Sequence, residues 1–290
     1  MDSFRNKLGR RFTLTFEADP PKGLKMDRLL DRVGEAIPGF DAVMVADNTF
    51  ATLRLSALAF GTILQQKCSV PVVMHQTARD MNYLGLQSHL LGAWALGIQH
   101  ILCMTGDSPR FGTFPDATPV YDFNSVTLIQ MVRRLNAGDV FVNRDTRITG
   151  STDYLIGCVA NPYVPNLRAE VSRLAKKAAA GARFVVTQPV FDVSTAERFL
   201  EYTKDIPIVK LLGVMLLKGH RNALNIASIA PDIFIPADVY TRLKANDTPE
   251  EGVLIAKDFI RAMKPKVGGI HIFPLARYNA LREFIEFRED

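Results

Sequence analysis

Cysteine is scarce in this chain of 290 residues. Its three cysteines, Cys68, Cys103 and Cys158, lie far apart and form no C-x-x-C pair. This spacing argues against a cysteine-rich metal cage and against a secreted scaffold held together by disulfides. Cys103 and Cys158 stand in apolar runs, where we expect buried and unreactive thiols.

Long hydrophobic runs and concentrated charge are also missing. No apolar run approaches the length of a membrane span, and residues 1–12 contain no apolar signal core. The 35 lysines and arginines outnumber the 30 aspartates and glutamates, but they are scattered rather than gathered in the stripe typical of a nucleic-acid binder. We therefore expect a cytoplasmic protein that binds neither membranes nor nucleic acid. The mild positive charge suits either solubility or an anionic small ligand.

The chain instead shows a regular alternation of short β-rich runs and longer helical segments. Eight of these runs are mostly continuous and apolar, which is typical of parallel strands covered on both faces. The expected strands are residues 12–16, 42–45, 72–74, 101–104, 155–159, 184–186, 208–212 and 269–273. The expected helices are residues 27–36, 51–66, 83–96, 125–135, 166–180, 194–204 and 247–263. Ser194 with Glu197 suggests a capping box, and Pro249 suggests a helix start.

Eight β/α units in sequence predict an α/β fold, the (β/α)8 TIM barrel. The main alternative is a doubly wound open sheet, which would favour a glycine-rich turn after its first strand. Here that strand is followed by Glu17-Ala18-Asp19-Pro20-Pro21, and the chain contains no P-loop. Because no linker, repeat or change of composition marks a boundary, we expect residues 1–290 to form a single catalytic domain.

Polar residues end or follow most of the expected strands, which is where a TIM barrel carries its chemistry. They are Glu17, Asp47, Asn48, His75, Thr105, Gly106, Asp107, Asn161, Gln188 and Arg277. Each has an ordinary structural explanation, because polar residues must end strands and Asp or Asn often caps the next helix. Their recurrence on strand after strand predicts a polar mouth of mixed charge above an apolar barrel.

Two carboxyl groups stand out at this predicted mouth. Glu17 lies between Phe16 and Ala18, a setting that could raise its pKa toward that of a proton donor at neutral pH. Asp107 follows a glycine that allows close approach to a ligand, and its charge could stabilise a cation. The alternatives are a solvated rim carboxylate and a turn or capping Asp. His75 lacks companions for a metal site, so we expect no metal.

A series of short fragments follows a fixed order along nearly the whole chain. The fragments are Phe16-Glu17 with Pro20-Pro21, His75-Gln76-Thr77 with Arg79-Asp80 and Asn82, Leu86-Gln87-Ser88, Leu96-Gly97-Ile98, Thr105-Gly106-Asp107-Ser108-Pro109, Lys177 with Ala180-Gly181-Ala182, Thr187-Gln188-Pro189-Val190-Phe191-Asp192, and Gly269-Ile270-His271. In this order and spacing they resemble the methylenetetrahydrofolate reductase family. The resemblance is to its short, single-domain prokaryotic type, and it implies a flavin-dependent TIM-barrel enzyme.

The resemblance implies roles for individual residues. Glu17 matches the general acid that protonates the folate, so that its five-membered ring opens to an iminium ion. Asp107 matches an aspartate that stabilises the iminium and tunes the flavin. Positions that match substrate contacts are Gln188, His220 and Arg277. Positions at or beside flavin contacts are His75, Thr105, Gly106, Asp107, Tyr121, Asp122, Lys176 and Lys177.

The resemblance also implies the overall reaction. Reduced flavin passes the hydride on its N5 to the iminium carbon of methylenetetrahydrofolate, which gives 5-methyltetrahydrofolate. The resemblance favours FAD over FMN, NAD(P)H or an electron-delivering partner subunit as reductant, and a homo- or hetero-oligomer. Residues Ala46, Asp47, Ala160 and His220 depart from the best-known bacterial relatives on the cofactor and substrate sides. The alternatives are a flavin-independent homologue, a corrinoid-linked methyltransferase and a folate-binding scaffold subunit.

Overall fold

The computed structural model describes residues 3–141, 147–230 and 232–288. In these ranges eight parallel strands close into a barrel in chain order, and the last strand pairs with the first. The strands are β1 (Thr13–Ala18), β2 (Ala42–Val45), β3 (Val72–Thr77), β4 (His100–Met104), β5 (Leu155–Ala160), β6 (Phe184–Pro189), β7 (Val209–Met215) and β8 (Gly269–Phe273). The TIM barrel predicted from the sequence is therefore confirmed.

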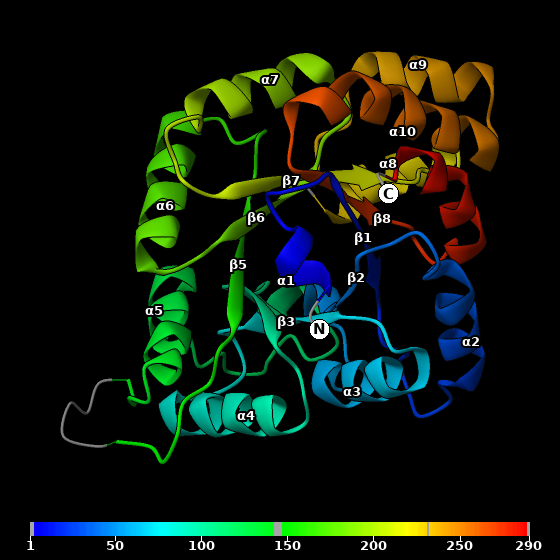
Figure 1. Ribbon diagram of the computed structural model, residues 1–290. Coiled ribbons are helices and arrows are strands. Elements are labelled where there is room, and N and C mark those ends of the chain that lie inside the picture. Colours follow the sequence, from blue (N-terminus) through cyan, green and yellow to red (C-terminus); the bar gives the residue numbers. More distant parts are fainter. Residues whose placement is uncertain (1–2, 142–146, 231, 289–290) are drawn as a thin grey trace.

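Helices surround this barrel on the outside (Figure 1). They are α1 (Ser3–Lys7), α2 (Asp27–Ala36), α3 (Ala57–Cys68), α4 (Tyr83–Ala95), α5 (Ser125–Asn136), α6 (Leu167–Ala180), α7 (Val193–Tyr202), α8 (His220–Ile229), α9 (Ala237–Ala245) and α10 (Pro249–Met263). Short 3-10 turns are η1 (Thr49–Ala51), η2 (Pro109–Phe111), η3 (Lys264–Lys266) and η4 (Tyr278–Phe287). The exception to the outer ring is α1, which lies across one end of the barrel (Figure 1).

All eight expected strands are present, and the differences lie mostly at their carboxyl ends. β3 continues through His75 to Thr77, and β6 continues through Gln188 to Pro189. The sequence predicted shorter strands because their last residues are polar. In the barrel these residues still pair with the neighbouring strands, as Thr77 does with Met104. Polar side chains thus stand on regular strands at the mouth, which holds them more firmly than loops would.

The expected helices are also present, with two corrections at their starts. The segment expected at 51–66 begins only at Ala57, because residues 49–51 form η1 and Ser56 caps the helix. The capping box predicted at Ser194 is wrong. Asp192 caps α7 by accepting a hydrogen bond from the Thr195 amide at 2.7 Å, and Ser194 donates its hydroxyl to the same carboxylate. The sequence did not predict α8 and α9, which extend the outer layer between β7 and α10.

The amino-terminal end of the barrel is closed by α1. Phe4 of this helix is fully buried and lies 5.2 Å from the His100 ring and 5.7 Å from the Phe184 ring, centroid to centroid. Both partners are the first residues of their strands. Lys7 pairs with Asp41 at 2.7 Å, which anchors the helix beside β2. One end of the barrel is therefore plugged with apolar side chains, and the opposite end carries the carboxyl ends of the strands.

The cysteines at positions 103 and 158 are buried thiols, as expected from their apolar surroundings. They are partners in the β4–β5 register and belong to the core between barrel and helices. Burial raises the pKa of both thiols, that of Cys158 to about 12. A thiol that stays protonated at neutral pH is a poor nucleophile, so neither cysteine takes part in the chemistry.

Candidate active site at the mouth of the barrel

The inward face of the barrel presents polar side chains above its apolar floor. Side chains alternate along each strand, so Thr15 and Glu17 share the inner face of β1, and His75 and Thr77 share that of β3. Below them, the innermost apolar residues come from the starts of the strands, as Phe184 and Val73 do. The polar groups thus cluster at the carboxyl end of the barrel, the end at which TIM-barrel enzymes work.

Glu17 has the environment of a proton donor. Its side chain is only partly exposed near the end of β1. Burial is the main cause that raises its pKa well above the ordinary value, and the nearby Asp19 carboxylate adds to the effect, whereas Arg54 opposes it. Because the shift favours the neutral carboxyl form, Glu17 can keep a proton at pH values where an exposed glutamate has lost it. This supports the expectation that it is an acid and disfavours a solvated rim carboxylate.

Two neutral histidines lie in the barrel interior. Burial lowers the pKa of His75 to about 3. Burial, followed by repulsion from His75, also lowers the pKa of His271 far below its ordinary value. The Nδ1 atom of His271 is 3.0 Å from the hydroxyl oxygen of Thr15. The Nε2 atoms of both rings are buried and have no hydrogen-bond partner among the described residues. Two buried polar atoms on the inner wall of the barrel therefore lack a protein partner, and such atoms in folded proteins usually bond to water or a ligand.

The loop after β4 carries the second predicted carboxylate. Gly106 has φ of +91°, and a Cβ built on it would be 2.9 Å from the Cβ of Thr77, so only glycine fits this turn. Asp107 follows on the surface, and its Oδ2 accepts a hydrogen bond from the Phe50 amide at 2.9 Å. Tyr121 donates its hydroxyl to the Asp107 carbonyl at 3.2 Å. These contacts join the loops after β2 and β4.

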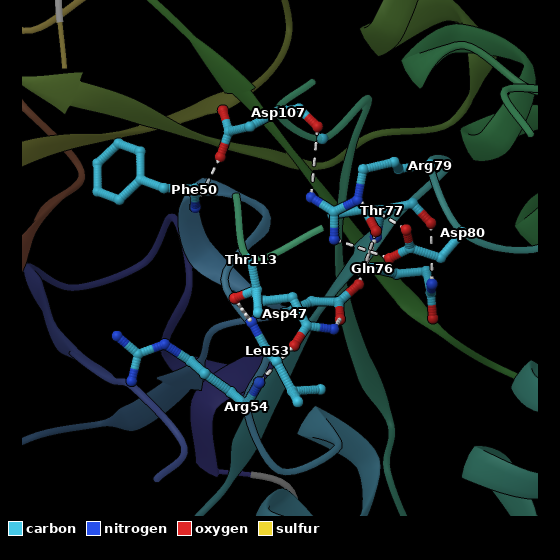
Figure 2. A network of polar contacts seen from close by, with 12 residues as sticks. Asp47, Phe50, Leu53, Arg54, Gln76, Thr77, Arg79, Asp80, Asp107 and Thr113 are labelled. Atoms are coloured by element: carbon cyan, nitrogen blue, oxygen red, sulfur yellow. Dashed lines mark hydrogen bonds and ion pairs between the residues drawn. The ribbon is translucent and has the colours of Figure 1, made fainter. Parts of the chain in front are cut away.

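A polar network joins the ends of β2, β3 and β4 (Figure 2). Asp47 accepts hydrogen bonds from the amide and the hydroxyl of Thr77, at 3.1 and 2.8 Å. Burial raises the pKa of Asp47, although both bonds from Thr77 oppose the shift. Arg79 is 3% exposed and pairs with both oxygens of Asp80, through Nε and Nη2, at 2.7 Å each. Its Nη1 approaches the Asp107 carbonyl at 3.4 Å.

The other predicted site residues lie around the rim. Gln188 is on the inner face of β6, in phase with Phe184 and Val186. Arg277 follows β8 and donates from Nη1 to the carbonyls of Pro249, at 2.9 Å, and Leu217, at 3.4 Å. Both residues are partly exposed and lie at the carboxyl ends of their strands.

Three of the predicted positions make structural contacts instead, and a fourth is exposed on a helix. Lys177 is buried and donates from Nζ to the Val159 carbonyl at 2.7 Å, whereas its neighbour Lys176 is exposed on α6. Asp122 accepts from the amide of Tyr83 at the start of α4. The ring of His220 packs edge-on against Tyr240 of α9, with centroids 6.0 Å apart. Their roles toward cofactor or substrate stay predictions.

The structure adds residues that sequence reasoning did not single out. Thr15 could have been found by stepping back two residues along the strand from Glu17. His271 and Arg79 stand in fragments that carry the family resemblance, but the sequence assigned them no role. The contact of His271 with Thr15 and that of Arg79 with the Asp107 carbonyl depend on barrel closure and loop geometry. Within the described ranges, no cluster of three or more His, Cys, Asp or Glu residues could hold a metal ion. None of the described helices is both long and apolar enough to cross a membrane.

The sequence profile of the family described as methylenetetrahydrofolate reductase matches residues 4–287. The chain belongs to this family. A probable methylenetetrahydrofolate reductase (NADPH) of Caenorhabditis elegans is 26% identical over 228 residues, which are 76% of this chain and 32% of that protein. The 5,10-methylenetetrahydrofolate reductase of Escherichia coli (strain K12) is 24% identical over 283 residues, which are 92% of this chain and 87% of that protein. The chain thus spans about a third of the worm relative and most of the bacterial one.

Solved structures show the same fold in proteins of distant sequence. A phosphonopyruvate hydrolase complex with oxalate and Mg²⁺ has a TM-score of 0.53 at 14% identity, covering 98% of this chain and 84% of that one. The spore cortex-lytic enzyme SleL of Bacillus megaterium QM B1551 has a TM-score of 0.53 at 12% identity, covering 97% and 74%. At such identities the likeness shows the TIM barrel alone.

Methylenetetrahydrofolate reductases are oxidoreductases of folate one-carbon metabolism, and family membership implies a flavin cofactor. The residues at the mouth fit such a group. The unpartnered Nε2 of His75 lies in the open half of the barrel and could exchange a hydrogen bond with a polar ring edge. Thr105 and the Asp107 carboxylate are exposed on the adjoining loop. Lys177 fits less well, because its ammonium group is already bonded to the Val159 carbonyl.

Proposed function

We propose that this chain reduces 5,10-methylenetetrahydrofolate to 5-methyltetrahydrofolate at the mouth of its barrel. The observation that carries the proposal is the contrast between two carboxyl groups at one site. Burial raises the pKa of Glu17 on β1, whereas Asp107 is exposed on the loop after β4. Carboxyl groups held in different environments take different roles, one as acid and one as charge stabiliser.

Glu17 is the general acid of the proposed reaction. Its neutral carboxyl donates a proton to a nitrogen of the five-membered folate ring, the carbon–nitrogen bond at that atom breaks, and an iminium ion remains on the substrate. A bound flavin supplies the hydride that reduces the iminium carbon. Thr15 and His271 lie on the same inner wall and share a contact of 3.0 Å, which orders the polar groups beside the acid.

Asp107 stabilises the positive charge of the iminium. Among the described residues, only its Oδ2 has a hydrogen-bond donor, the Phe50 amide, so Oδ1 is available to a cation. A fixed carboxylate near a developing positive charge lowers the barrier because it needs no reorganisation during the reaction. Gln188 binds the pterin, while Arg277 and His220 contact the rest of the substrate.

The cofactor in this proposal is FAD in preference to FMN. His75, Thr105, Gly106, Asp107 and Tyr121 would hold the flavin at the mouth, and Asp122 and Lys176 would bind it beside them. Lys177 would join them only by exchanging its bond to the Val159 carbonyl for one to the cofactor. NAD(P)H or an electron-delivering partner subunit supplies the electrons, and the chain works as a homo- or hetero-oligomer. One assay distinguishes the two electron donors. Brisk NADH-driven turnover by the isolated chain would show that no partner subunit is needed.

A half-reaction assay tests the proposed function. We expect the purified holoenzyme to release a flavin on denaturation and to oxidise methyltetrahydrofolate with an artificial acceptor. Glu17→Gln, which can neither donate the proton nor take it up again when the ring closes during oxidation, is expected to slow this folate half-reaction by about 10²- to 10⁴-fold. Reduction of the bound flavin by a chemical reductant should change far less. The control is Glu35→Gln, because Glu35 is exposed on α2 and pairs only loosely, at 3.7 Å, with Arg282.

Three results would contradict the proposal in different ways. A flavin-free protein that is active with reduced nicotinamide would show that the cofactor is wrong. A flavin-free protein that transfers the methyl group of methyltetrahydrofolate to a corrinoid would favour the methyltransferase alternative. Equal folate half-reaction rates for Glu17→Gln and Glu35→Gln would exclude Glu17 as the acid.

A further inference from the structure

Arg79 is a buried cation for which neither the fold nor the proposed reaction has an assigned use. It follows β3 at the mouth, and its side chain is 3% exposed. Burying an arginine is unfavourable unless acceptors surround it. Burial lowers its pKa, but the carboxylates of Asp80, Asp47 and Asp107 outweigh this and raise it overall. The guanidinium thus lies among three carboxylates that come from three different strand ends.

The side chain is held in one orientation by Asp80. Nε and Nη2 each donate to a different oxygen of that carboxylate at 2.7 Å, the two-pronged geometry that only a planar guanidinium provides. Asp80 itself is about half exposed, so the pair costs less to bury than a fully enclosed one. With two of its nitrogens fixed, the third nitrogen, Nη1, has a defined direction (Figure 2).

That third nitrogen points to the turn that carries Asp107. Nη1 is 3.4 Å from the Asp107 carbonyl, which also accepts the Tyr121 hydroxyl at 3.2 Å. The backbone next to Arg79 is also bonded to this turn, since the amide of Ala78 donates a hydrogen bond to the carbonyl of Thr105 at 3.2 Å. The carbonyl of Arg79 accepts from the Val120 amide at 2.8 Å, one residue before Tyr121.

Tight packing leaves this turn little freedom on the side of β3. A Cβ on Gly106 would lie 3.2 Å from the Cβ of Arg79 and 2.9 Å from that of Thr77. The turn is therefore pressed against residues 77–79. Among the described residues, the opposite side of Asp107 is held only by the hydrogen bond from the Phe50 amide to its carboxylate. When a substrate competes for that carboxylate, the contacts from the Arg79 side are those that remain.

We propose that Arg79 is a positioning residue, which fixes the Asp107 turn so that its carboxylate faces the cationic folate intermediate. The inference rests on the proposed role of Asp107 in the reductase reaction. Arg79 itself contacts neither substrate nor cofactor in this proposal. The ion pair with Asp80 fixes the orientation of the guanidinium. The guanidinium and the Tyr121 hydroxyl hold the Asp107 carbonyl. Holding this carbonyl fixes the position of the Asp107 carboxylate. Displacing a reacting group by about 1 Å can cost on the order of 100-fold in rate, so the effect is measurable.

The test is a double-mutant cycle on the holoenzyme, measured as kcat and KM of methyltetrahydrofolate oxidation with an artificial acceptor. Arg79→Lys keeps the charge but loses the two-pronged geometry. We expect it to lower kcat by about 10- to 100-fold, with bound flavin content and the unfolding temperature close to those of the parent. In the Asp107→Asn background, Arg79→Lys is expected to change kcat by less than about twofold, because residues that act as one unit are not additive.

Two further variants separate positioning from a general structural role. Asp80→Asn removes the partner that orients Arg79, and it should reproduce the loss in kcat without touching Asp107. Arg242→Lys is the matched control, because Arg242 pairs with Glu251 and with Asp258, at 2.9 Å, on the outer helices. It should leave kcat and KM unchanged.

The outcomes also separate this inference from the proposed function. An unimpaired Asp107→Asn enzyme would overturn both, since Arg79 acts through Asp107. An impaired Asp107→Asn enzyme with an unimpaired Arg79→Lys enzyme would overturn the inference alone. The same would follow if Arg79→Lys kept its full effect in the Asp107→Asn background, or if its loss of activity matched a loss of bound flavin.

Discussion

The two ends of this barrel differ in what they contain and in how their backbone is arranged. At the amino-terminal end, Phe4 fills the opening and packs against aromatic rings from the first residues of two strands. At the carboxyl end, carboxylates, amides, imidazoles and a buried guanidinium lie on the last residues of the strands and on the loops that follow them. Outside glycine, seven of the described residues have positive φ, namely Asn48, Phe50, Ala51, Ser69, Tyr121, Leu275 and Ala276. All but Ser69 lie in loops that follow strands at the mouth.

This difference shows where stability and strain are placed in one molecule. A left-handed backbone costs a residue with a side chain about 1–2 kcal/mol. The amino-terminal end is stabilised by large apolar contacts. The mouth is destabilised by left-handed backbone conformations and by buried polar groups. The barrel between them is continuous, so contacts at one end support the unfavourable geometry at the other.

The largest expected effect is the loss of stability when the plug at the amino-terminal end is removed. Phe4→Ala removes a fully buried ring and leaves a cavity, so we expect the free energy of unfolding to fall by about 3–5 kcal/mol. Urea unfolding measures this loss. Phe111→Ala is the matched control, because this ring is 79% exposed on the mouth loop η2 and its loss should change stability by about 0.5 kcal/mol or less. Similar losses in both variants would show that the two ends do not differ in this way.

The next effect concerns the histidines of the open half. Burial lowers the pKa of His75 to about 3, so between pH 6.5 and 3 the unfolded chain binds a proton that the folded chain does not. Stability is therefore fully present above pH 6.5 and falls as the pH drops, by up to about 1.4 kcal/mol per pH unit for this group. His75→Gln should flatten the decline in urea unfolding at pH 7.5, 6.0 and 5.0. An equally steep decline in the His75→Gln variant would contradict this expectation.

The smallest effect relieves strain in the loop after β2. Ala51 has φ of +51°, which glycine adopts without a steric penalty. Because glycine also gains freedom in the unfolded chain, we expect Ala51→Gly to raise the free energy of unfolding by only up to about 1 kcal/mol. Ala175→Gly, at an exposed position of the right-handed helix α6, should instead lower it by about 1 kcal/mol. Opposite signs for two identical substitutions would locate the strain at the mouth.

Much of the barrel could be predicted because its strands are covered on both faces and therefore consist of apolar runs. The same rule explains where prediction stopped short. His75 and Thr77 belong to β3 although they are polar, because they face the barrel interior at the mouth while keeping the strand pairing. Helices α8 and α9 had no such clear signal, since they form an outer layer that packs against α10.

The sequence predicts which positions carry the residues of the candidate site. It does not predict which of these residues contact one another. Glu17 and Asp107 follow from their places at strand ends. The bond from the Phe50 amide to Asp107 joins residues 57 positions apart, and the contact of Thr15 with His271 joins residues 256 positions apart. Such pairs depend on barrel closure and on loop geometry, which periodicity along the chain does not encode.

The pairing of β8 with β1 has a consequence for how the protein is made. Glu17 and Thr15 leave the ribosome well before His271, which lies on the last strand of the barrel. Until β8 docks beside β1, Glu17 lies on an open sheet edge in contact with water and behaves as an ordinary glutamate. The raised pKa of Glu17 therefore depends on closure of the barrel, and a chain synthesised only as far as β7 carries the residue without it.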